Sequence, residues 1–452
     1  MDLHRQLLMR AEQGRPLRVG LIGAGKFGSM FLAQAPRIPG LHVLGVADLS
    51  VSRAEKALAT AGWPKERFSA PSFAKALDQG STHVTDDAEA LINTGGMEVV
   101  IEATGAVEAG IRHATACIDR GRHVIMVTVE ADALVGPLLA QRARQAGVVY
   151  SLAYGDQPAI ICEQVDWARV SGFEVVCAGK GTKYLPEYHA STPDSVWDHY
   201  GLTARQAAAG NMNPKMFNSF VDGTKSAIEM AVVANATGLT PAPEGLGFPP
   251  AGSAELAHVC RPRSDGGTLN HKGTVEVVSS LHRDGSQVAG DLRWGTYVTF
   301  EASSSYVRRC FSEYGLATDD SGRYAALWRP HHLIGLELGL SVASVGLLGL
   351  GTGSACGFRA DVVATAKKGL EAGQVLDGEG GYSVYGKLMP ARDSLDMGAL
   401  PMGLSDGARL KTHIASGQVI RRADVELDEE APALRFRREM EAAFDGGGAP
   451  AA

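Results

Sequence analysis

The segment Arg18-Val-Gly-Leu-Ile-Gly-Ala-Gly-Lys-Phe-Gly28 decides the fold of this chain. Its apolar first half predicts a buried parallel strand, and its second half carries the spacing G-x-G-x-x-G at Gly23, Gly25 and Gly28. A predicted helix follows, and a second apolar run then ends in Asp48, about 20 residues after the glycines. The local order is therefore strand, glycine turn, helix, strand and acid.

This context is the one in which a glycine turn binds a dinucleotide. Gly23 permits the tight turn, Gly25 lets backbone N–H groups approach a pyrophosphate, and Gly28 lets the helix pack closely. A later strand ends in a turn that we expect to pass near the nicotinamide ribose, or else to be an ordinary turn from strand to helix. The expected residues for binding NAD or NADP are Gly23, Gly25, Lys26, Phe27, Gly28, Asp48, Ala103, Thr104 and Gly105. A Rossmann turn that has lost its cofactor is the alternative.

Asp48 bears on the choice between the two cofactors. A carboxylate at this position binds the adenosine ribose 2′-OH and repels a 2′-phosphate, which favours NAD. Ser50, Ser52 and Arg53 follow closely and offer contacts to a 2′-phosphate if Asp48 turns away. The sequence leaves both NAD and NADP open.

The rest of the chain predicts an α/β fold class with several domains. Strands alternate with helices through residue 154, which predicts a doubly wound parallel sheet. Helical patterns and alternating strand-like runs then indicate an α+β domain with an open antiparallel sheet, followed by short strands and turns. The expected parts are a Rossmann domain at 17–155, an α+β domain at 156–330, a packing helix at 331–358, a small β-rich domain at 359–440 and a flexible tail at 441–452.

Composition excludes several classes of function. The 452 residues carry 43 basic and 50 acidic side chains, so the chain lacks the basic surface of a nucleic-acid-binding protein. The uncharged run at 338–358 holds too many Gly, Ser and Thr residues for a membrane span, and we expect a buried packing helix followed by a loop there. The six cysteines are scattered, and the N-terminal segment shows no secretion signal, which predicts a cytoplasmic protein.

A polar stripe marks the segment that begins at Pro214. We expect this segment to be one helix, in which five polar residues fall within a fan about 80° wide, opposite an apolar face. These residues are Lys215, Asn218, Asp222, Lys225 and Glu229. One interpretation is a solvated face with ion pairs between successive turns. The other is a general acid/base set, in which a Lys donates a proton and carboxylates orient it or hold a metal.

Two further stretches are candidates for ligand binding. A strand from Glu174 is predicted to run into a glycine-flanked basic loop, where Lys180, Thr182 and Lys183 would hold a phosphate or carboxylate. A surface β-turn is the alternative. Asp156 lies where the last Rossmann strand leaves its sheet, at the edge where ligands bind, or else in a hinge turn.

Four motifs together resemble a known group. They are Tyr-Gly-Asp-Gln-Pro at 154–158, Ala-Gly-Lys-Gly-Thr-Lys-Tyr-Leu-Pro-Glu-Tyr-His at 178–189, the stripe segment at 213–230 and His-Leu-Ile-Gly-Leu-Glu-Leu-Gly at 332–339. Over about residues 15–440 the chain resembles homoserine-dehydrogenase-like oxidoreductases with a C-terminal SAF domain, including the DXR-like reductoisomerases. The resemblance implies a central domain for catalysis and dimerisation, a helix that returns to the Rossmann domain, and a β-clip (SAF) module.

The resemblance also implies an activity. It is the NADPH-linked reductive isomerisation of 1-deoxy-D-xylulose 5-phosphate in isoprenoid synthesis, with a divalent cation, Mg²⁺ or Mn²⁺, left open. Lys180, Lys183 and Lys215 suit the substrate anion, and Lys225 suits proton transfer. The residues implied for a metal or acid/base role are Asp222, Glu229, Glu130 and Asp156, and those for substrate contacts are Thr182 and Asn218.

Other activities stay open. Homoserine dehydrogenases carry a catalytic Lys where this chain has Glu130, which argues against that reaction. The alternatives are a dehydrogenase of another sugar acid or polyol, a homoserine-dehydrogenase-like enzyme, or a dinucleotide-binding sensor with a SAF ligand module. We expect a small anionic substrate, no nucleic acid or membrane partner, and a homo-oligomer, either a dimer or a tetramer.

Overall fold

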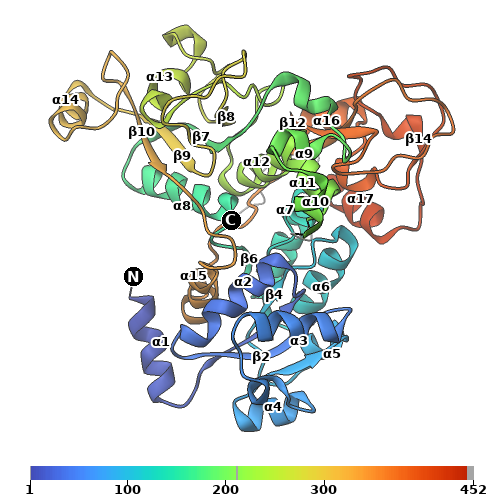
Figure 1. Ribbon diagram of the computed structural model, residues 1–452. Helices are drawn as coiled ribbons and strands as arrows, with labels where there is room; N and C mark the ends of the chain where they lie inside the picture. Colours follow the sequence, from blue (N-terminus) through green and yellow to red (C-terminus); the bar gives the residue numbers. More distant parts are fainter. Residues whose placement is uncertain (1, 210–211, 445–452) are drawn as a thin grey trace. The chain divides into compact units, whose positions relative to one another are not determined.

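The computed structural model describes residues 2–209 and 212–444 (Figure 1). Within these residues the chain forms two compact units. Unit 1 contains the chain up to Ile160 together with His332–Cys356, and unit 2 contains Ile161–His331 together with the chain from Gly357 onward. Both units are therefore built from two separate stretches of sequence.

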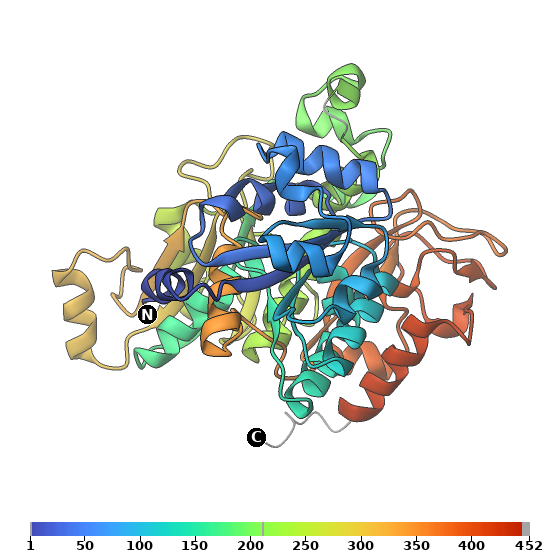
Figure 2. The same ribbon diagram turned by 90° about the horizontal axis from the view of Figure 1, so that it is seen from below.

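Unit 1 is organised around a six-stranded parallel sheet with the order β3-β2-β1-β4-β5-β6. The strands are β1 (Leu17–Ile22), β2 (Leu41–Ala47), β3 (His83–Thr85), β4 (Val99–Glu102), β5 (His123–Met126) and β6 (Tyr150–Leu152). The helices are α1 (Leu3–Glu12), α2 (Lys26–Gln34), α3 (Val51–Thr60), α4 (Phe73–Gln79), α5 (Ala88–Asn93), α6 (Val107–Asp119) and α7 (Val129–Gln145). Helices lie on both faces of the sheet (Figure 2). The predicted doubly wound fold is confirmed.

The second stretch of unit 1 completes its core. α15 (Gly339–Ala343) continues into the π-helical turn η6 (Ser344–Leu348), and Leu338, Val342 and Val345 are buried in the same cluster as the β1 side chains. Gly353 O accepts a hydrogen bond of 2.8 Å from Leu152 N, so the stretch also extends the edge at β6. No helix in the described part of the chain is long and apolar enough to cross a bilayer.

Unit 2 contains a four-stranded sheet with the order β10-β9-β7-β8. The strands are β7 (Glu174–Thr182), β8 (Thr274–Ser279), β9 (Thr296–Glu301) and β10 (Tyr324–Arg329). The expectation of an open antiparallel sheet is wrong in one respect, because β8 pairs with β7 in parallel. The helices before residue 331 are α8 (Gln157–Val170), α9 (Val196–Tyr200), α10 (Ala204–Ala209), α11 (Pro214–Val221), α12 (Thr224–Thr237), α13 (Leu256–Val259) and α14 (Ser305–Glu313).

The C-terminal part of unit 2 is rich in short strands, as expected. The elements are β11 (Ala360–Ala366), β12 (Val384–Pro390), α16 (Ala391–Met397), β13 (Arg409–Leu410), β14 (Val425–Glu426) and α17 (Pro432–Phe444). α17 is held by Arg437, whose buried guanidinium donates to both carboxylate oxygens of Asp361 at 3.0 and 2.6 Å. The predicted tail starts too early, because 441–444 are helical. Its remainder, 445–452, lies outside the described residues.

Unit 1 also buries a carboxyl group with incomplete hydrogen bonding. Asp132 on α7 is completely buried, and its Oδ2 accepts a hydrogen bond of 2.8 Å from the Tyr150 hydroxyl. Its Oδ1 has no hydrogen-bond partner among the described residues. Burial raises the pKa of Asp132 to about 6, although the Tyr150 bond acts in the opposite direction.

This carboxyl should make stability depend on pH. A pKa raised from 3.8 to about 6 means that the folded form binds the proton more tightly. The stabilisation is present below pH 4 and is lost as pH rises to 6, by about 3 kcal/mol at about 1.4 kcal/mol per pKa unit. We expect Asp132→Asn to remove this component. Chemical denaturation of both proteins between pH 4 and 7 measures it, and parallel curves would contradict the assignment.

Candidate functional site

The glycine turn of unit 1 joins the end of β1 to the start of α2. Gly23 has a φ of +98°, and a Cβ there would overlap the Ala103 carbonyl, so only glycine fits. A Cβ at Gly28 would overlap the Gly23 carbonyl, which explains how the helix packs so closely. At Gly25, the N-cap of α2, no atom lies within 4 Å of an added Cβ. The helix N-terminus therefore opens onto free space, as a pyrophosphate site requires.

Asp48 ties the end of β2 to this turn. Its Oδ2 accepts from Ala24 N at 2.9 Å, and its Oδ1 accepts from Ser50 N at 2.9 Å and lies 2.6 Å from Arg53 Nη2. Burial acts to raise the pKa of Asp48, but these donors hold it below its usual range. The carboxylate is thus ionised, and the Arg53 side chain beside it is 60% exposed. Groups suited to a ribose hydroxyl and to a phosphate lie side by side.

The loop at residues 103–105 adjoins the glycine turn, because Ala103 N donates to Ile22 O at 2.8 Å. Glu102, completely buried at the end of β4, accepts from the Thr104 hydroxyl at 2.6 Å and also from the Thr128 hydroxyl. Gly105 N in turn donates to the Thr128 hydroxyl at 3.0 Å. The predicted cofactor residues therefore lie together at the carboxyl ends of β1, β2 and β4. Glu102 was missed, and its signal is a lone acid ending an apolar run.

Glu130 and Asp156 lie after the next two strands. Glu130 is in the first turn of α7, which follows β5, and Asp156 follows β6 and accepts from Gln157 N at 2.9 Å. Because β5 and β6 are parallel neighbours, both acids are at the sheet edge where ligands bind. Within residues 2–209 and 212–444, no group of three or more His, Cys, Asp or Glu side chains could hold a metal ion.

In unit 2, the predicted basic loop is wrong. Lys180 and Thr182 belong to β7, and only Lys183 lies beyond it. Cβ atoms at Gly179 and Gly181 would overlap neighbouring carbonyl groups, so these glycines allow close backbone packing and do not form a loop. Lys183 Nζ donates to His199 O at 2.6 Å, and burial, with Arg293 nearby, lowers the pKa of Lys183.

Lys180 forms a buried ion pair instead. Its Nζ donates to Glu229 Oε2 on α12, and the two side chains are 5% and 3% exposed. The pair therefore joins the sheet to the helix that covers it. Successive side chains of a strand point to opposite faces of the sheet, so Lys180 lies on the face opposite to Gly179 and Gly181.

The polar stripe does not lie on one helix. α11 ends at Val221, and α12 begins at Thr224 after Gly223, whose φ is +88°. The interpretation as a solvated face is wrong for Asn218, Asp222 and Glu229, which are all buried. Lys215 is the exception, with its side chain 44% exposed and its Nζ 3.9 Å from Asp406. Lys225, the second residue of α12, is partly buried.

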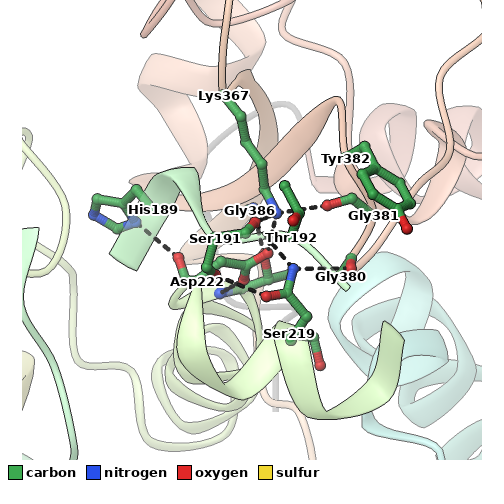
Figure 3. A network of polar contacts seen from close by, with 12 residues as sticks. His189, Ser191, Thr192, Ser219, Asp222, Lys367, Gly380, Gly381, Tyr382 and Gly386 are labelled. Atoms are coloured by element: carbon green, nitrogen blue, oxygen red, sulfur yellow. Dashed lines mark hydrogen bonds and ion pairs between the residues drawn. The ribbon is translucent and has the colours of Figure 1, made fainter. Parts of the chain in front are cut away.

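Asp222 is the centre of a polar network that sequence analysis missed in part (Figure 3). Lys367 Nζ donates to Asp222 Oδ2 at 2.7 Å, to Ser191 O at 2.8 Å and to Gly381 O at 2.7 Å. The Asn218 amide donates to Ser191 O at 3.1 Å. Lys367 follows β11, and its signal is a pair of lysines at the end of an apolar run. The network links residues from three distant parts of the sequence.

His189 closes one side of this network. Its Nδ1 lies 2.7 Å from Asp222 O, and its Nε2 lies 2.9 Å from the Tyr184 hydroxyl. Because a carbonyl oxygen only accepts, Nδ1 carries the proton and Nε2 accepts from Tyr184. Burial lowers the pKa of His189, and its ring stacks on Tyr385 at 4.3 Å. His189 is thus a neutral packed side chain.

Unit 2 also has a cavity of about 360 Å³ outside the predicted site. Glu276 of β8 lines it, is buried, and accepts from Gly247 N at 3.0 Å and from Val277 N at 2.8 Å. Burial raises the pKa of Glu276 to about 7. Arg263 and Arg283 line the same cavity. Sequence analysis missed Glu276 because polar and apolar residues alternate around it, as they do in a strand with one exposed face.

Several solved structures are similar to the chain in part. A biliverdin reductase from Synechocystis sp. PCC 6803 with biliverdin and NADP⁺ is 19% identical over 38% of this chain and 48% of that one, with a TM-score of 0.26. A myo-inositol dehydrogenase from Lactobacillus casei with NAD(H) and myo-inositol is 16% identical over 40% and 50%, with a TM-score of 0.28. The chain thus spans about half the length of these structures. No curated protein matches it.

A family of oxidoreductases matches the middle of the chain. Residues 155–338 match the family model described as "Oxidoreductase DRL, catalytic domain". The matched region is less than half of the chain and includes Lys180, Lys225 and Glu229. Asp156 also falls within it, whereas the glycine turn lies outside it. The expectation of an oxidoreductase is confirmed by this match, which makes residues 155–338 similar to a catalytic domain of that family.

Proposed function

We propose that the protein is an NAD(P)-dependent oxidoreductase that acts on a small anionic hydroxy-carbonyl compound. The observation that carries the proposal is the intact glycine turn, with open space at Gly25 in front of α2. The match of residues 155–338 to an oxidoreductase catalytic domain supports it. A sensor that binds a dinucleotide without turnover is disfavoured by the same match.

The residues present fit a dinucleotide. Backbone N–H groups at the start of α2 would hold the pyrophosphate, and Asp48 or Arg53 would hold the adenosine ribose or its 2′-phosphate. The loop at 103–105 would contact the nicotinamide ribose. When bound, the nicotinamide ring supplies or accepts the hydride. The choice between NAD and NADP depends on which of the two neighbouring side chains faces the ribose.

Unit 2 supplies the candidate substrate residues. Lys225 would donate a proton to the carbonyl oxygen as it becomes a hydroxyl, and Lys183 and Lys215, which both reach solvent in part, would bind the substrate anion. Lys180 and Glu229 are paired and buried, so their contribution would be to hold β7 against α12. Glu130 and Asp156 stay candidates for acid/base roles.

The most specific form of the proposal is a reductoisomerase of 1-deoxy-D-xylulose 5-phosphate. The resemblance at 178–189 and 213–230 supports it, together with the family match. A dehydrogenase of another sugar acid or polyol, or a homoserine-dehydrogenase-like enzyme, is the second candidate. As part of the same proposal, residues 359–440 form a SAF module and the protein is a homo-oligomer.

Turnover with a panel of substrates tests the function. NADPH and NADH are titrated first, and oxidation is then followed with 1-deoxyxylulose 5-phosphate, aspartate semialdehyde, and four- and five-carbon sugar acids, each with and without Mg²⁺ or Mn²⁺. We expect saturable binding of one dinucleotide and turnover of at least one phosphorylated or carboxylated compound. If neither dinucleotide binds saturably, the proposal is wrong.

Gly25→Val tests the cofactor site without a change of fold. Gly25 has a φ of −72° and open space at its Cβ, so valine should be tolerated in the empty protein. The valine methyl groups would occupy the pyrophosphate position, and we expect at least a tenfold loss of dinucleotide affinity by fluorescence titration. Gly95→Val is the matched control, because Gly95 also has no atom within 4 Å of its Cβ. Equal affinities of both variants would argue against the site.

Lys225→Met tests the proton donor. Removal of a general acid lowers turnover by about 10²-fold or more, whereas dinucleotide affinity should stay unchanged because Lys225 is not among the residues expected to bind the dinucleotide. Lys368→Met, at an exposed lysine of the same unit, is the control. Steady-state kinetics with the substrate found above measure the effect. Wild-type turnover in the Lys225 variant would contradict the assignment of α12 to the active site.

A further inference from the structure

The C-terminal β-rich stretch contributes a lysine whose ammonium group is fully used inside unit 2. Lys367 is 2% exposed at its side chain, and Nζ has three protein acceptors within 2.8 Å: Asp222 Oδ2, Ser191 O and Gly381 O. An ammonium group has three N–H bonds, so none is left to bind or protonate a substrate. The contribution of Lys367 is therefore made through the groups it holds.

Asp222 connects Lys367 to α12. Its Oδ2 accepts a hydrogen bond from Lys367 Nζ, and its Oδ1 accepts a hydrogen bond of 2.9 Å from Thr224 N, the first N–H of α12. The Asp222 carboxylate is completely buried, so it has no water to replace the lysine. Lys367 thus holds the Asp222 carboxylate in place, and this carboxylate caps the start of α12. Lys225 is the second residue of that helix.

The same helix start is held from two other directions. The Thr224 hydroxyl accepts from Gly386 N of β12 at 2.8 Å. A Cβ at Gly223 would lie 3.2 Å from His189 Cε1, so the left-handed turn before α12 is closely packed. Gly386 lies on β12, and Lys367 directly follows β11. The two strands pair along their whole length, which makes them one rigid support. Figure 3 shows Lys367, Gly386 and His189 arranged around Asp222.

We propose that Lys367 is a positioning residue for the proposed active site, acting through Asp222 to fix the start of α12 and hence the place of Lys225. The inference rests on the proposed function, in which Lys225 transfers the proton. It also assigns a role to the C-terminal stretch: its first two strands are part of the catalytic framework of unit 2.

The test compares Lys367→Met with the double variant Lys367→Met/Asp222→Asn in the full chain. The single variant leaves a buried carboxylate without its cation and is expected to unfold more easily, whereas the double variant removes both charges and keeps an amide oxygen to cap Thr224. Lys368→Met, next in sequence but exposed, is the control. Hydrogen exchange of peptides covering 222–230 is measured by mass spectrometry, together with kcat, KM and dinucleotide affinity.

We expect at least tenfold faster exchange at the start of α12 in the double variant, and at least a tenfold fall in kcat with dinucleotide affinity within twofold of wild type. The pH dependence of kcat should also shift, because Lys225 changes its surroundings, whereas a simple loss of folded protein would lower kcat equally at every pH. Lys368→Met should match wild type.

The proposal is overturned if the double variant, folded by its thermal midpoint, keeps wild-type exchange at 222–230 or wild-type kcat and pH profile. Failure of the proposed function gives a different result, namely wild-type turnover in Lys225→Met. If Lys225→Met loses turnover and the double variant behaves like wild type, the positioning role of Lys367 is contradicted and the proposed function is not.

Discussion

The burial of the Lys367 ammonium group against the Asp222 carboxylate is the constraint on which unit 2 depends. Removing an ion from water costs several kcal/mol even after relaxation, so a buried pair persists only when every hydrogen-bonding position is satisfied. Here the partners come from residues 191, 222, 367 and 381. These segments must all reach their final places together, which makes the C-terminal strands part of one compact unit with the helices near residue 220.

The sequence predicts a structural feature well when residues close together in the chain determine it, and poorly when the residues that determine it are far apart in the chain. The turn at residues 23–28 and Asp48 were predicted in detail, because their conformation follows from local periodicity and from glycine sterics. Lys180 was misplaced, since the glycines on each side of it resemble a loop and are explained only by carbonyl groups of β8 and of the segment before β9. The helix break has a local signal in Gly223 itself, whereas the contact of Lys367 with Asp222 joins residues 145 positions apart, which no local pattern contains.

Two buried carboxyl groups of unit 1 show how burial and hydrogen-bond donors together decide charge. Burial acts to raise the pKa of both Asp48 and Asp132. Asp48 receives two backbone N–H groups and a guanidinium, and its pKa falls below the usual range. Asp132 receives one hydroxyl, and its pKa stays raised at about 6. The two aspartates thus have opposite protonation tendencies, because Asp132 is more deeply buried and receives fewer donors than Asp48.

The discontinuity of unit 1 has a consequence for synthesis on the ribosome. The β1 to β6 strands emerge first, but Leu338, Val342 and Val345 belong to their core and arrive only after the whole of residues 161–331 has been made. Until then the apolar side of β1 near Leu17 lacks its cover, and the edge at β6 lacks the Gly353 carbonyl. The nascent N-terminal unit therefore passes through a long interval with an exposed apolar surface, and such surfaces make incompletely folded chains prone to aggregation.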